Sequence, residues 1–312
     1  MMMILIISVL LVLILATFIY HAVASKIEQD KYPPPGQLID VGGYKLHLYS
    51  IGEGSPTVIF DHTLGSLGWS NYFVFTEIGK ITRVVVCDRA GYGDSETSPK
   101  PRTSEEIVQE LHTLLTKAEI PQPYVFVGDS FGGYTARLYA HKFPDQVVGM
   151  VLTHALHEDT VLNFPISIIM IKIVFLIGFK VTQISAKFGV VRLAGLMGLF
   201  EFFKKELRHF EEADLMRLKI SFYSGKHWEA MFREVRDITT SSEQIKNTGS
   251  LNNMPLVIVS VKHFLRRSLL TFFLPLKQVD EAWTKMQPEL LKLSSNSKEI
   301  VAENSGHFVG ID

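Results

Sequence analysis

Apolar residues follow three different patterns along the chain, and each pattern predicts a different kind of element. Residues 1–24 are almost wholly apolar, with no charge before Lys26. This apolar stretch is long enough for a helix that spans a bilayer. Short apolar runs then recur and predict strands at 38–41, 44–50, 56–60, 83–87, 124–127, 146–153, 255–261 and 298–302. Apolar residues at helical spacing predict a helix at 103–118, and another is expected at 280–293. Strands that alternate with helices indicate an α/β fold with a mostly parallel sheet covered on both faces.

The pattern changes after residue 153, where a long apolar stretch carries scattered lysines. The segment 166–179 is short for a membrane span and has Lys172 in its middle, so we expect hydrophobic cap helices there. Residues 201–234 carry mixed charges and predict further helices of the same insertion. We therefore predict a membrane or signal segment at 1–25, a linker at 26–37, and one α/β domain at 38–312 with a cap at about 157–245.

The N-terminal segment has two interpretations. An A-x-A pattern at 22–24 is compatible with a cleaved signal peptide. We favour an uncleaved transmembrane anchor, because the apolar stretch is long and no basic residue precedes it. Acidic and basic residues both follow it, so the flanks do not define the orientation. We expect a single-pass membrane protein, and we take an extracytoplasmic domain as the working hypothesis.

Composition narrows the classes of partner. The formal net charge is −1 and the basic residues are scattered, which gives no electrostatic footprint for nucleic acid. The single cysteine, Cys87, lies in an apolar run and is expected to be a small core residue. One cysteine excludes an internal disulfide framework and a cysteine-rich metal site. We predict neither a metal nor another cofactor.

The stretch at 124–137 holds the most informative motif. An apolar strand runs into a Gly-Asp-Ser-Phe-Gly turn at 128–132, and a helix with a small or apolar face follows. A serine on a strained strand-to-helix turn needs neighbours without bulk, which Gly128 and Gly132 provide. The N–H groups at the start of the helix face the place where an oxyanion would form. This context predicts that Ser130 is a nucleophile.

Three motifs in this order give the chain a resemblance to a known family: Asp-Arg-Ala-Gly-Tyr-Gly at 88–93, the serine turn at 128–133, and Ser-Gly-His-Phe at 305–308. From about residue 38 to the end, the chain resembles the α/β-hydrolase superfamily. It is most similar to bacterial esterase-like members with an N-terminal apolar segment. The resemblance implies a mostly parallel eight-stranded sheet with a helical cap after the sixth strand.

The resemblance also implies roles for individual residues. Ser130 matches the nucleophile, and His307 matches the general base on the loop after the last strand. The main-chain N–H groups of Phe131 and Leu64 match the two donors of the oxyanion hole. An imidazole titrates near neutrality, so His307 is suited to take the proton of Ser130 and return it to the leaving group.

The third member of the expected triad departs from the family pattern. The loop at 262–267, after the seventh strand, contains no acid, and His154 stands at the end of the sixth strand where relatives commonly have aspartate. Relatives commonly have histidine where this chain has Asp129, so these two positions look exchanged and could be in contact. The acid would then be Asp159, Glu158 or Asp129, and we select Asp159.

These residues support two hypotheses of function. The first is a membrane-anchored serine hydrolase that cleaves carboxylic esters, with an apolar small molecule as substrate. Epoxide hydrolase and dehalogenase chemistry is disfavoured, because those relatives place aspartate where Ser130 stands. The second is a non-catalytic or weakly active ligand-binding or membrane-associated protein on the same fold, suggested by the missing acid. The resemblance also implies a further helix after His307, whose absence would mean a fragment or a sheet face with exposed apolar surface and poor solubility.

Overall fold

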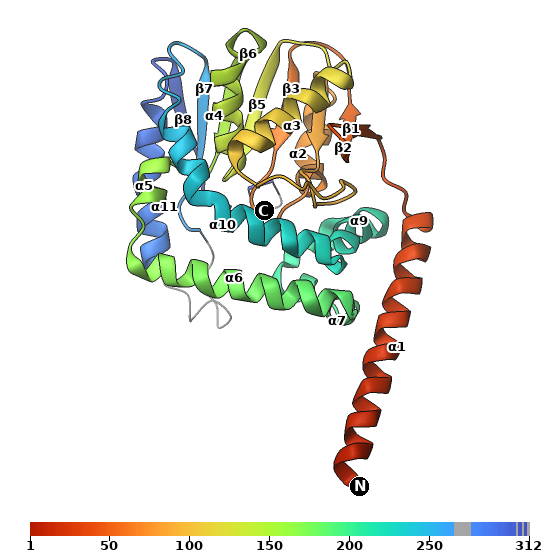
Figure 1. Cartoon of the computed structure of the whole chain (residues 1–312). Coiled ribbons are helices and arrows are strands. Elements are labelled where there is room, and N and C mark those ends of the chain that lie inside the picture. The colour runs from red at the N-terminus through yellow and green to blue at the C-terminus, as the bar shows by residue number, and fades with distance from the viewer. Residues whose placement is uncertain (265–275, 304, 308, 311–312) are drawn as a thin grey trace.

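A computed structural model describes residues 1–264, 276–303, 305–307 and 309–310. Eight strands in this part of the chain form one sheet in the order β1-β2-β4-β3-β5-β6-β7-β8 (Figure 1). β2 pairs antiparallel with β1 and with β4, whereas all the other neighbours are parallel. The strands are β1 Gln37–Asp40, β2 Lys45–Ile51, β3 Thr57–Asp61, β4 Val84–Cys87, β5 Tyr124–Asp129, β6 Val147–Thr153, β7 Leu256–Val261 and β8 Ser297–Ala302.

The central strands are buried on both faces, which explains their continuous apolar sequences. All residues of β3 and β4 are buried. Alternate residues of β3 pack on opposite sides: Ile59 joins the main core with α3 and α4, and Phe60 joins a second core with Phe75 of α2. The helices and 3₁₀ turns of this layer are η1 Gly68–Asn71, α2 Tyr72–Ile78, α3 Ser104–Lys117, α4 Gly132–Lys142, η2 Pro144–Gln146 and α11 Leu276–Leu291.

The cap is inserted between β6 and β7. Its helices lie across one end of the sheet, with α10 next to the strands and α6 on the outside (Figure 1). Lys180 of α6 pairs with Glu229 of α10 at 2.7 Å, which joins the two long cap helices. The cap elements are α5 Glu158–Leu162, α6 Ile166–Lys187, α7 Val190–Leu196, α8 Leu199–Phe203, η3 Lys205–His209, α9 Glu212–Tyr223 and α10 Gly225–Lys246.

The N-terminal helix α1, Met2–Lys31, projects from the domain on the side of the cap (Figure 1). It continues through residues expected to belong to the linker, because no helix breaker occurs before Pro33. Among the described residues, α1 and α6 are the helices that are long and apolar enough to cross a membrane. The predicted α/β fold, with a mostly parallel sheet, a cap after the sixth strand and an apolar N-terminal helix, is confirmed.

Candidate active site

Ser130 occupies the turn between β5 and α4, where the backbone is strained. Its φ is 52°, a left-handed conformation that side chains other than glycine rarely adopt. The turn is also tightly packed: a Cβ atom on Gly128 would lie 2.7 Å from the carbonyl oxygen of Gly132, and one on Gly132 would collide with the carbonyl oxygen of Asp61. The two glycines are therefore required by the close approach of backbone segments around Ser130.

Phe131 and Leu64 are the residues whose main-chain N–H groups are predicted to form the oxyanion hole. Phe131 immediately precedes α4, and its side chain is buried. The first N–H groups of a helix have no acceptor within the helix and lie at the positive end of its dipole. Leu64 belongs to the loop after β3 and packs against the main core. Its role as a second donor stays a prediction.

Arg89 holds the loop that carries Leu64. Its Nη1 donates to the carbonyl oxygen of His62 and to Asp61 Oδ1, both at 2.6 Å, and its Nη2 donates to the carbonyl oxygen of Thr63 at 3.2 Å. Its Nε and Nη2 also donate to the two carboxylate oxygens of Glu234, at 2.8 and 3.0 Å. Because Glu234 lies on α10, this buried guanidinium joins the loop to the cap.

His307 lies at the same edge of the sheet, five residues after β8. Its ring is buried, and its Nε2 lies 3.5 Å from Thr63 Oγ1. Its Nδ1 lies 2.6 Å from Nδ1 of His154, the residue after β6. The backbone N–H of Ser130 donates to the carbonyl oxygen of Thr153 at 2.9 Å. Because His154 follows Thr153, the serine turn lies beside His154. Between the described residues Ser130 and His307, however, no direct hydrogen bond is formed.

The contact between two imidazoles constrains their tautomers. One Nδ1 must donate and the other must accept, because two bare nitrogens would repel each other. If His307 donates, its Nε2 is left without a proton and is suited to act as a base. If His154 donates, Nε2 of His307 carries the proton and cannot accept one from a serine.

Aromatic rings surround this pair of histidines. Phe264 stacks on His307 with ring centroids 4.1 Å apart, and Trp283 contacts both histidines. Burial in these apolar surroundings lowers the pKa of His154 to about 4. The pKa of His307 is lowered well below its usual value, first by burial and then by His154 and Lys204. Burial therefore favours the neutral form of both rings.

The carboxylates considered for the triad lie elsewhere. Asp159 is on α5, its side chain is 60% exposed, and it pairs with Lys246 Nζ at 3.3 Å. Glu158 is held by Arg137 through two hydrogen bonds of 2.6 and 2.8 Å. The structure therefore gives Asp159 a surface ion pair, and the place beside Nδ1 of His307 that was expected for it is taken by His154.

Asp129 is buried and also differs from the expectation. Burial raises the pKa of its carboxyl to about 8, against the opposing effect of Arg89, so the group is largely protonated at neutral pH. Its Oδ1 has no hydrogen-bond partner among the described residues. The exchanged pair expected between Asp129 and His154 is not formed, since the hydrogen-bonding partner of the His154 ring is His307.

The carboxylate that acts on His154 is Asp280, which the sequence reasoning missed. Asp280 lies on α11, where its charge raises the pKa of His154 against the larger effect of burial. Its Oδ1 accepts the backbone N–H of Phe264 at 2.7 Å, which places it beside the loop after β7. Residues 265–267 of that loop and Phe308 of the histidine motif lie outside the described residues. A short motif does not reveal Asp280, because the helix that carries it begins 15 residues after β7.

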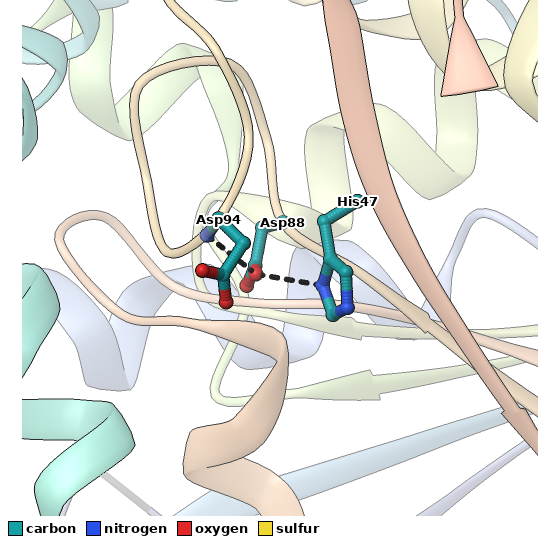
Figure 2. Close-up of side chains that lie close together, drawn as sticks. All are labelled: His47, Asp88 and Asp94. Carbon is teal, nitrogen blue, oxygen red and sulfur yellow. Dashed lines mark hydrogen bonds and ion pairs between the residues drawn. The ribbon is translucent and has the colours of Figure 1, made fainter. Parts of the chain in front are cut away.

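In the part of the chain that the structure describes, one group of side chains has ligand atoms close enough for a metal ion: His47, Asp88 and Asp94 (Figure 2). His47 Nδ1 donates to Asp88 Oδ2 at 3.0 Å, and its Nε2 donates to the carbonyl oxygen of Pro35 at 2.6 Å. Burial acts to lower the pKa of His47, but the hydrogen bond to Asp88 contributes to a net raised pKa. Burial likewise acts to raise the pKa of Asp88, but the hydrogen bond from His47 contributes to lowering it to about 2. A ring that donates from both nitrogens is an imidazolium, so this arrangement is an ion pair that fastens Pro35 to the domain.

A family model, a curated relative and solved structures all match parts of this chain. Residues 56–170 match the family model for the alpha/beta hydrolase fold. The uncharacterized protein YbdG of Bacillus subtilis (strain 168) is 27% identical over 146 residues, which are 46% of this chain and 45% of YbdG. The chain therefore matches about half the length of that relative.

Solved structures extend the likeness over most of the chain. The Cif epoxide hydrolase from Acinetobacter nosocomialis superposes with a TM-score of 0.69 and 15% identity, covering 93% of this chain and 92% of that one. An esterase from Exiguobacterium antarcticum superposes with a TM-score of 0.60 and 14% identity, covering 87% and 92%. Identities this low show the fold alone. Together with the sheet order, the serine turn and the cap described above, they lead to one conclusion: the chain has the α/β-hydrolase fold.

Proposed function

We propose that the protein is a serine hydrolase that cleaves carboxylic esters of apolar substrates through an acyl-enzyme on Ser130. The observation that carries this proposal is the strained serine turn: Ser130 has a φ of 52° and stands at the start of α4. Strain of this kind is typical of functional positions, where the surrounding structure holds the side chain ready to react. A serine at that point favours acyl transfer.

The proposed reaction has two halves. His307 Nε2 takes the proton of Ser130 as Oγ attacks the ester carbonyl, and the N–H groups of Phe131 and Leu64 stabilise the oxyanion. The imidazolium then protonates the departing alkoxide, which leaves as the alcohol. In the second half, His307 takes a proton from water, the resulting hydroxide attacks the acyl-enzyme, and the proton returns to Ser130 as the acid is released. This reaction requires the tautomer in which His307 donates to His154.

An apolar substrate is favoured by the surroundings of the site. The rings of Phe264 and Trp283 pack around His307. Pockets with such linings gain affinity with each added methylene of the substrate. The names of the structural relatives, an esterase and an epoxide hydrolase, are compatible with a small-molecule hydrolase. Through α1, the enzyme would be anchored to a membrane as a single-pass protein.

A second function is favoured by the histidine pair. His154 carries no negative charge, so the imidazolium that forms on His307 during catalysis gains less stabilisation than a carboxylate would provide. A weakly active or non-catalytic protein that binds an apolar ligand or associates with a membrane would tolerate this substitution. The second hypothesis therefore rests on His154, whereas the first rests on Ser130.

Replacing Ser130 by alanine tests the catalytic proposal. We expect Ser130→Ala to lower kcat/KM for a p-nitrophenyl ester of a medium-chain fatty acid by about 10³-fold or more, because removing a catalytic serine removes the acyl-enzyme route. Ser250→Ala is the matched control, since Ser250 is exposed on a loop. The wild-type enzyme should also prefer longer acyl chains to acetate. Equal rates for the wild type and Ser130→Ala would contradict the proposal.

A further inference from the structure

The anchor helix is fixed to the cap at a defined level. Arg192 of α7 is buried and holds three residues of α1: it pairs with Glu28, donates to Ser25 Oγ at 2.8 Å, and donates to His21 Nδ1 at 3.1 Å. One turn nearer the N-terminus, Phe18 contacts Phe188 with ring centroids 6.4 Å apart. Residues 18–28 of α1 thus contact the domain, and the apolar residues before Phe18 project beyond the cap.

The part of α1 beyond this level has almost the length of a bilayer core. At about 1.5 Å per residue, residues 2–17 extend about 24 Å past the cap. The hydrocarbon core is about 30 Å thick, so an anchor attached in this way brings the cap into contact with the membrane surface.

The outer face of α6 has the composition that such a position needs. Every exposed residue of α6 up to Ile184 is apolar or glycine. These residues recur at helical spacing, so they form one stripe; the exposed large side chains are Ile166, Ile169, Met170, Ile173, Val174, Phe175, Ile177, Val181 and Ile184. The neighbouring segment at 190–203, which includes α7 and α8, exposes further large apolar side chains: Val190, Leu193, Leu196, Met197, Leu199, Phe202 and Phe203. We call the whole set the cap face.

Lys172 and Lys180 of α6 are directed away from the cap face. Lys180 pairs with Glu229 of α10 and lies over the ring of Phe232. Lys172 Nζ approaches Thr239 Oγ1, also on α10, at 3.4 Å. A helix on the surface of a protein in water shows the opposite arrangement, with its charges outward and its apolar residues toward the core. An apolar surface of this extent marks a contact site, and α6 runs across the side of the molecule from which α1 projects (Figure 1).

We propose that the cap face lies in the interface of the same bilayer that α1 spans, with α6 in the plane of the membrane. This inference rests on the anchoring role proposed above for α1, and it goes further by assigning the cap a lipid contact. It also places the cap over the catalytic site at the membrane surface, so that an apolar ester would reach Ser130 from the lipid phase. We therefore expect the substrates to be esters that dissolve in the lipid phase.

Quenching by lipid-borne nitroxides tests the position of the cap face. The full-length chain with Cys87→Ala would carry an environment-sensitive fluorophore on one new cysteine and would be reconstituted at one copy per phosphatidylcholine nanodisc. Ile177→Cys probes the cap face, Val9→Cys probes the middle of the part of α1 that projects past the cap, and Gln109→Cys on the exposed side of α3 is the matched control. Nitroxides are placed either near the headgroup or near the end of the acyl chain.

The inference predicts that the probe at 177 is quenched mainly by the shallow nitroxide, the probe at 9 mainly by the deep one, and the probe at 109 by neither. A probe at 177 that escapes both nitroxides would overturn the inference while leaving α1 as an anchor, and a second copy or another protein would then have to cover the cap face. Quenching at 177 mainly by the deep nitroxide would overturn it in favour of a second span. Absence of quenching at 9 would show that the proposed anchoring itself fails.

Discussion

Replacing His154 by aspartate is expected to raise the rate of ester hydrolysis by about 100-fold or more. The 2.6 Å contact between Nδ1 of His154 and Nδ1 of His307 would become a contact with a carboxylate. A carboxylate accepts the Nδ1 proton, selects the tautomer with a bare Nε2, and stabilises the imidazolium. In Ser-His-Asp enzymes, losing that charge costs roughly 10⁴-fold in kcat. The left-handed backbone at position 154, with φ of 43°, is one that aspartate tolerates.

The pH dependence of the two proteins should differ in a defined direction. His307 acts as a base only when neutral. In the wild type its pKa is lowered well below 6.5 by burial and by His154, so activity should persist to acid pH before it declines. An aspartate at 154 favours the protonated ring and raises this pKa, so the acid limb of kcat/KM should move to higher pH. His154→Asn is the control, because asparagine has the size of aspartate but no charge. If His154→Asn raised kcat/KM as much as His154→Asp, the electrostatic explanation would be refuted.

Arg89→Met is expected to lower the free energy of unfolding by about 3–5 kcal/mol, because it leaves the buried carboxylates of Asp61 and Glu234 without their cation. It also releases the carbonyl oxygens of His62 and Thr63, which position the loop that carries Leu64. We therefore expect kcat to fall more than KM rises, since an oxyanion donor acts in the transition state. Urea unfolding and steady-state kinetics measure the two effects.

Two further variants separate charge from geometry at this position. Arg89→Lys keeps the charge but lacks the planar set of donors, so it should recover only part of the stability and little of kcat. Arg89→Met combined with Glu234→Gln should be more stable than Arg89→Met alone, because one unpaired carboxylate is removed. If Arg89→Lys matched the wild type in both measurements, the positioning role of Arg89 would be disproved.

The sheet and the serine turn could be predicted because local residues determine them. The apolar runs of β3 and β4 have no polar face, which already requires cover on both sides. Gly128 and Gly132 identify the turn because no side chain fits there. The end of α1 was harder to locate, since the residues between Lys26 and Lys31 are compatible with either a helix or a linker.

The partner of His307 could not be predicted, because it depends on how separate strand ends meet. His154 directly follows β6 and His307 lies five residues after β8, with β7 between these strands in the sheet, so no motif reveals their contact. Asp280 reaches the site from a helix that packs back on the loop after β7. Asp159 was chosen for its nearness to β6 in sequence, yet the start of α5 directs it to Lys246 at the surface.

The central claim is that Ser130 is an activated nucleophile, and covalent labelling tests it most directly. The folded full-length protein would be treated with a fluorophosphonate in detergent, digested, and analysed by mass spectrometry of its peptides. The account predicts one adduct per chain on Ser130, none after heat denaturation, and none in Ser130→Ala. A folded sample that stays unlabelled at Ser130, or an adduct of equal yield in Ser130→Ala, would contradict it.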